Sequence, residues 1–188
     1  MAQKSKLWRR FPVKQNKNPR LSLVYLAQAG VIAAAYTALT VLLQPLSYGA
    51  LQVRVSEMLT ILPVYTPAAI PGLAVGCFLS NLLGLSSGAN PAGGWDLLFG
   101  TLATLVAAWL TRKGKAVRPG GVPLLSTLPP VFVNAVVIGA ELYVVYGGFP
   151  WWLHMLAVAG GQLVACVGCG LLFATTLEKT GIVKHLLS

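Results

Sequence analysis

The chain has 188 residues, of which 56% are hydrophobic and only 10% are charged, and its mean hydropathy is +0.72. A soluble domain usually carries about a quarter charged residues, so this composition excludes a water-soluble globular protein and predicts an integral membrane protein. The net charge of +10 could suggest nucleic-acid binding, but seven of the 14 basic residues lie in the first twenty positions and four more lie at 112–118. Such clusters are typical of cytoplasmic loops, and we expect no nucleic acid as a partner.

A helix that crosses about 30 Å of hydrocarbon needs about 20 mostly apolar residues. After a basic cytoplasmic tail at 1–20, six stretches are predicted to cross, at about 21–43, 49–65, 66–84, 93–112, 122–146 and 151–177. The first is longer than the apolar core of a signal peptide, so it is predicted to be a membrane span rather than a cleaved signal. The short second stretch is included because both basic clusters should face the cytoplasm, so an even number of crossings must separate them. The sequence therefore predicts an all-α bundle of six transmembrane helices at 21–188, with both termini cytoplasmic and a chain reversal near Tyr65.

Few polar or aromatic side chains interrupt the spans, and this topology places most of them at the outer ends. They are Arg54, Glu57, Asn81, Trp95, Asp96, Glu141, Trp151 and Trp152. Three of the four acidic residues are among them, and carboxyl groups within a bilayer usually mark a site or a pathway. Asn134 lies two helical turns before Glu141, on the same face. We therefore expect an outward-facing polar pocket for a small, planar, nitrogen-rich ligand. Its carboxylates would accept hydrogen bonds from the ligand's N–H donors or balance its positive charge, and its tryptophans would stack on the ligand's ring.

Several of these residues also have a structural interpretation. Glu57 lies three residues after Arg54 and could simply pair with it. Asp96 could stabilise the N-terminus of a helix through the helix dipole. The tryptophans could form the ordinary aromatic belt of a membrane protein.

Other motifs bear on partners and on catalysis. Small residues recur every four positions at Ala29/Ala33 and at Ala34/Ala38, which suits either internal helix packing or docking to another membrane subunit. No P-loop motif, zinc-protease motif or nucleophile-elbow motif occurs, so we expect no ATP site and no enzyme activity. Cys166 and Cys169 form a C-x-x-C pair without further soft ligands nearby, and buried apolar cysteines are the better interpretation than a metal site.

Two runs carry a resemblance to a known family. QVRVSEMLTILPVYTPAAIPGLAVGCFLSNLLG, which starts at Gln52, and WDLLFGTLATLVAA, which starts at Trp95, resemble the queuosine-precursor transporter (QueT) family. The likeness is dense from about Leu51 to Ala108 and looser in the first span. Members of that family are substrate-binding S-components of energy-coupling factor (ECF) transporters. The resemblance implies a six-helix protein of the bacterial plasma membrane that captures its ligand from outside.

The resemblance also implies partners and roles for individual residues. The partners are a membrane scaffold (T) subunit and two cytoplasmic ATPase subunits, which hydrolyse ATP, and this chain binds no cofactor. The family's docking face carries over onto Ala34 and Ala38. The implied substrates are 7-deazaguanines, such as the 7-aminomethyl or the 7-cyano compound.

In this interpretation Glu57 lines the mouth of the site with Arg54 and accepts from the N–H edge of the ligand. Asp96 and Glu141 are competing acceptors, and Asn81 is a partner for the ring carbonyl. The alternatives are an S-component for another vitamin or base, including thiamine-like ligands, and a stand-alone secondary carrier or channel that needs no ATPase. A purely structural subunit would leave the outer acidic residues unexplained.

Overall fold

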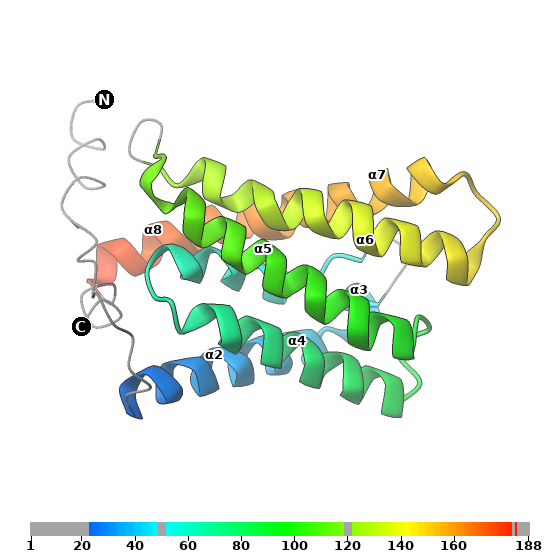
Figure 1. The fold of residues 1–188 in the computed structure, drawn as a ribbon, viewed down its shortest axis with the longest axis horizontal. Helices are drawn as coiled ribbons and strands as arrows, with labels where there is room; N and C mark the ends of the chain where they lie inside the picture. Colours follow the sequence, from blue (N-terminus) through cyan, green and yellow to red (C-terminus); the bar gives the residue numbers. More distant parts are fainter. Residues whose placement is uncertain (1–22, 49–51, 119–121, 182, 184–188) are drawn as a thin grey trace.

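The computed structural model describes residues 23–48, 52–118, 122–181 and 183, and every regular element in these ranges is helical. The predicted basic tail at 1–20 lies outside the described residues. The described chain passes repeatedly along the long axis of the molecule (Figure 1). The passes are α2 (Leu23–Leu42), η1 (Val55–Val64), α4 (Ala69–Ser86), η2 with α5 (Asp96–Gly100, Thr101–Lys113), η5 with α6 (Leu124–Thr127, Leu128–Tyr146), and α7 with η6 and α8 (Trp151–Gln162, Leu163–Cys169, Gly170–Thr180).

The connections define two ends of the bundle. The terminal end holds the start of α2, the turn at Tyr65 between η1 and α4, the end of α5 with η3 (Gly114–Ala116), and the end of α8 (Figure 1). The hairpin end holds α3 (Gln44–Ser47) and the α4–η2 and α6–α7 connections. The reversal near Tyr65 occurs as predicted, since η1 ends at Val64 and α4 starts at Ala69.

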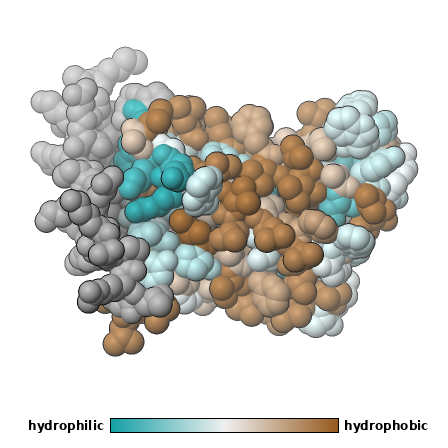
Figure 2. Space-filling model, in the orientation of Figure 1, coloured by the Kyte–Doolittle hydropathy of each residue, from teal (hydrophilic) through white to brown (hydrophobic). Residues whose placement is uncertain are grey.

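Among the described residues, four helices are long and apolar enough to span a membrane, and they are Leu23–Leu42, Ala69–Ser86, Leu124–Tyr146 and Trp151–Thr180. Large apolar side chains are exposed along these helices, and apolar residues cover the middle of the face in Figure 2. In water such a surface would aggregate, whereas lipid accepts it. The described part of the chain is therefore a multi-pass membrane protein.

The predicted second span differs most from the structure. In place of a transmembrane helix at 49–65, η1 is a ten-residue 3-10 helix that contains Pro63. At about 2 Å per residue it is roughly 20 Å long, which is shorter than the hydrocarbon layer of about 30 Å. Eight of its residues are buried, because other helices enclose it, and a membrane protein tolerates irregular backbone only where protein or water surrounds it. The pass η2–α5, which starts at Asp96, also lies outside the four candidate spans, so six membrane spans and the cytoplasmic termini stay predictions.

Close packing of α2 on α4 depends on glycine. A Cβ atom at Gly72 would lie 2.8 Å from the carbonyl oxygen of Ala29, and one at Gly76 would lie 2.9 Å from that of Ala33. Ala29 and Ala33 therefore serve internal packing, in the small-residue pattern that lets helices approach closely in lipid. The second pair, Ala34 and Ala38, is exposed on the opposite face of α2.

Candidate functional site

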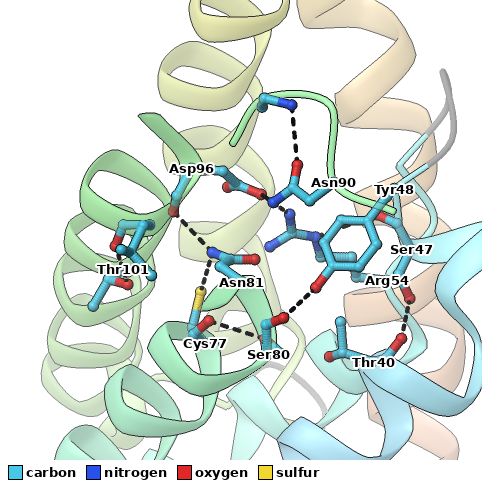
Figure 3. A network of polar contacts seen from close by, with 12 residues as sticks. Thr40, Ser47, Tyr48, Arg54, Cys77, Ser80, Asn81, Asn90, Asp96 and Thr101 are labelled. Atoms are coloured by element: carbon cyan, nitrogen blue, oxygen red, sulfur yellow. Dashed lines mark hydrogen bonds and ion pairs between the residues drawn. The ribbon is translucent and has the colours of Figure 1, made fainter. Parts of the chain in front are cut away.

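A buried ion pair joins distant parts of the chain at the hairpin end. Nη2 of Arg54, the residue before η1, pairs with Oδ2 of Asp96, the first residue of η2, and the two side chains are 4% and 0% exposed. Asn90 donates to the same Oδ2 at 2.9 Å, and Nε of Arg54 donates to the carbonyl oxygen of Ser47 at 3.3 Å. The guanidinium also lies 5.2 Å from the ring centre of Tyr48. Buried charges are stable only when they are paired and hydrogen-bonded. Oδ2 of Asp96 meets that condition, whereas its Oδ1 has no hydrogen-bond partner (Figure 3).

Residues of α4 complete the network from one side. Nδ2 of Asn81 donates to the backbone oxygen of Asp96 at 2.8 Å, and the Tyr48 hydroxyl donates to the carbonyl oxygen of Ser80 at 2.6 Å. Gly100 lies against this cluster, because a Cβ atom there would collide with Oδ1 of Asp96. The network is thus a rigid support that holds Arg54 beside η1.

A small polar cavity lies next to this support. It is lined by Gln52, Arg54, Glu57, Gly100, Thr104, Asn134, Ile138 and Gln162. The lining comes from the segment before η1 and from η1, η2, α5, α6 and α7. Gln52 has a φ of 44°, the one positive φ of a non-glycine residue in the described ranges. Such strain persists only where surrounding contacts enforce it, and it is enriched at functional sites.

Glu57 provides the cavity with an available acceptor. Its side chain is 1% exposed, and Oε1 accepts a hydrogen bond from the hydroxyl of Tyr36 on α2 at 2.5 Å. Oε2 is buried and has no hydrogen-bond partner. A buried acceptor without a partner is costly, and this oxygen is available to a donor group in the cavity.

Glu141 is a second buried carboxyl group at this end. It is 8% exposed, and neither of its carboxyl oxygens has a hydrogen-bond partner. The charged groups that lie near enough to act on it are Asp96 and Arg54. As the sequence predicts, it shares the buried face of α6 with Asn134.

Most of the predicted site residues come together, although not with the predicted partners. Arg54, Glu57, Asn81 and Asp96 form one connected region, with Glu141 close to it. The predicted alternative of an Arg54–Glu57 pair is wrong, because Arg54 pairs with Asp96. Asp96 also lies in the first turn of η2, in line with its interpretation as a helix-terminus residue.

The tryptophans do not join this region. Trp95, Trp151 and Trp152 are 57%, 54% and 50% exposed, and none of them lines the cavity. Trp95 stacks on Phe99, with ring centres 5.7 Å apart. Their exposure at the starts of helices at the hairpin end fits the aromatic-belt alternative rather than a rim around a ligand.

Several residues in or beside the cavity were not among the predicted site residues. Gln52 and Gln162 interrupt apolar runs, and a search for amides within predicted spans could have found them. Tyr36 gave no signal, because a tyrosine in an apolar helix is ordinary. Its contact with Glu57 joins residues 21 positions apart and exists only in the folded chain.

This chain is similar to known proteins over most of its length. The model of the family described as QueT transporter matches residues 26–179, which include every residue of the cavity. The protein named Queuosine precursor transporter QueT, from Lactococcus lactis subsp. cremoris (strain MG1363), is 37% identical over 79 residues, which are 40% of this chain and 42% of that protein. The aligned part thus spans less than half of that relative. No solved structure matches the chain significantly.

Proposed function

The chain belongs to the QueT transporter family, and from this premise we propose that it binds a queuosine precursor and serves its uptake. The ligand is a 7-deazaguanine, such as 7-aminomethyl- or 7-cyano-7-deazaguanine. The chain acts as the substrate-binding S-component of an ECF-type importer. It has no ATPase role of its own.

The observation that carries this proposal is the free Oε2 atom of Glu57 in the cavity. A guanine-type ring presents N–H donors along its pyrimidine edge, and a carboxylate accepts such donors in strong, charge-assisted hydrogen bonds. Tyr36 holds the other oxygen at 2.5 Å, so the acceptor is already oriented before ligand binds. Such preorganisation lowers the entropic cost of binding.

The amide groups around the cavity complete the recognition of the ring. Asn134 and Gln162 line it, and their amides can serve the ring carbonyl and the remaining donors. Asn81 is less suited to the carbonyl role expected for it, because its Nδ2 donates to Asp96. Arg54 supports the site through Asp96 and contributes positive charge at its wall.

A thermal-shift panel tests the choice of ligand. A ligand at 100 times its Kd adds about 2.7 kcal/mol, which for a chain of this size raises Tm by about 5–11 °C at about 2–4 °C per kcal/mol. We expect this rise with 7-deazaguanines and none with thiamine. A rise with thiamine or another vitamin, and none with any 7-deazaguanine, would refute the proposed substrate.

The proposed partners are a membrane scaffold (T) subunit and two cytoplasmic ATPase subunits. Ala34 and Ala38 form an exposed small-residue face on α2, against which a scaffold helix can pack closely. In this arrangement the hairpin end faces outside the plasma membrane. The terminal end, with the basic residues at 112–118, faces the cytoplasm.

Docking is tested with bulky residues on this face. The double variant Ala34→Leu and Ala38→Leu should lose co-purification with the scaffold and ATPase subunits while it keeps its ligand affinity. Val144→Leu, on an exposed position of α6, is the matched control and should keep both. Uptake of the ligand into proteoliposomes that contain this chain alone would instead favour a stand-alone carrier.

A further inference from the structure

The carboxyl groups around the site outnumber the cations that could neutralise them. Glu57, Asp96 and Glu141 are all at most 8% exposed. The cation that acts on them within the described ranges is Arg54, which pairs with Asp96. Glu57 and Glu141 have no cationic partner of their own among the described ion pairs.

Glu141 differs from the other buried carboxyl groups in lacking any partner. At the terminal end, Oε1 of Glu178 accepts from the Tyr65 hydroxyl at 2.7 Å and lies 3.4 Å from Nη1 of Arg118. Asp96 likewise forms an ion pair, with Arg54. A carboxyl group that stabilises the fold is normally paired in this way, so a purely structural role does not account for Glu141.

The position of Glu141 relates it to the cavity. It lies on α6 seven residues after Asn134, on the same face, and the cavity-lining Ile138 lies between them. Seven residues correspond to about 10 Å along a helix. Since α6 runs towards the hairpin end (Figure 1), Glu141 lies beyond the cavity on that side.

Binding through the pyrimidine edge fixes the orientation of a 7-deazaguanine in the site. The 7-substituent is on the five-membered ring, on the side away from the N–H edge that Glu57 would accept. In the orientation proposed below, the substituent extends along α6 towards the hairpin end. Glu141 is the unpartnered acceptor on the buried face of that helix.

We propose that the site selects a cationic 7-deazaguanine over a neutral one of similar shape, and that Glu141 is the specificity-determining counter-ion for the 7-substituent. The inference rests on the proposed function, because it requires the base to occupy the cavity. A protonated aminomethyl group donates charge-assisted hydrogen bonds, which are roughly twice as strong as neutral ones. A nitrile has no donor and leaves the carboxyl group unpaired, which is unfavourable in a buried site.

The test compares 7-aminomethyl- and 7-cyano-7-deazaguanine by calorimetric titration of the purified full chain. The wild type should bind the aminomethyl compound at least tenfold more tightly. Glu141→Gln should reduce this ratio to below threefold, chiefly by weakening the aminomethyl compound, with the cyano compound changed by less than threefold. Glu57→Gln should weaken both compounds together. Glu178→Gln, which alters a carboxyl group at the other end, should keep the wild-type ratio.

The wild-type ratio decides the selectivity even if a variant does not fold. Binding of both compounds with a ratio below threefold would overturn the selectivity and leave the proposed function standing. A tenfold wild-type preference that Glu141→Gln leaves intact would overturn the role of Glu141. Binding of neither compound would overturn the proposed function as well.

Discussion

The buried pair of Arg54 and Asp96 yields the sharpest prediction on stability. Asp96→Asn keeps the shape of the side chain but removes its charge, which leaves Arg54 uncompensated at 4% exposure. Breaking a buried pair from one side costs about 3–5 kcal/mol, and we expect the lower value, since asparagine can still accept one hydrogen bond. At about 2–4 °C per kcal/mol, Tm should fall by about 6–12 °C.

A double-mutant cycle in detergent, followed by intrinsic fluorescence, measures this effect. Arg54→Met with Asp96→Asn should be less destabilised than the sum of the single variants, because the double variant buries no unpaired charge. Lys179→Gln, at an exposed position of α8, is the control and should stay within about 0.5 kcal/mol of the wild type. A fall in Tm below about 2 °C for Asp96→Asn, or strict additivity, would refute a buried and coupled pair.

Three further changes have definite outcomes. Gly100→Ala places a Cβ atom against Oδ1 of Asp96, so it should cost about 1–3 kcal/mol and weaken ligand binding; an unchanged Tm would contradict the packing of η2. Gly76→Ala brings a Cβ atom within 2.9 Å of a carbonyl oxygen of α2 and should lower the stability by a similar amount. A variant as stable as the wild type would show that α2 and α4 are not in close contact. Tyr65→Phe removes the donor to the buried Glu178 and should cost about 1–3 kcal/mol by chemical denaturation, with no change in ligand affinity.

Much of the helical framework could be predicted from hydropathy, because long apolar runs have few alternatives in a membrane protein. The predicted spans at 21–43 and 122–146 correspond to Leu23–Leu42 and Leu124–Tyr146. The segment 49–65 could not be predicted in detail, since a short apolar run does not distinguish an α-helix from a 3-10 helix. Its form depends on enclosure by neighbouring helices, which is a property of the whole fold.

The candidate site could be predicted in composition but not in pairing. Carboxyl groups are rare in this chain and therefore easy to single out. The predicted direction of each span then placed three of them near the same end of the bundle. The pairing of Arg54 with Asp96 joins residues 42 positions apart, and local spacing favoured Glu57 as the nearer partner. Trp95 and Trp151 could not be assigned because an aromatic residue at the membrane interface has the same sequence context whether it contacts a ligand or lipid.

Titration of 7-aminomethyl-7-deazaguanine into the wild type and Glu57→Gln is the most direct test of the central claim, that Glu57 accepts the N–H edge of the ligand in the buried cavity. A hydrogen bond to a charged group contributes about 1.5–3 kcal/mol, so Kd should rise by about 10- to 150-fold, at about tenfold per 1.4 kcal/mol. The variant should remain folded, because glutamine can still accept from Tyr36. An unchanged Kd in a folded Glu57→Gln protein would contradict the account.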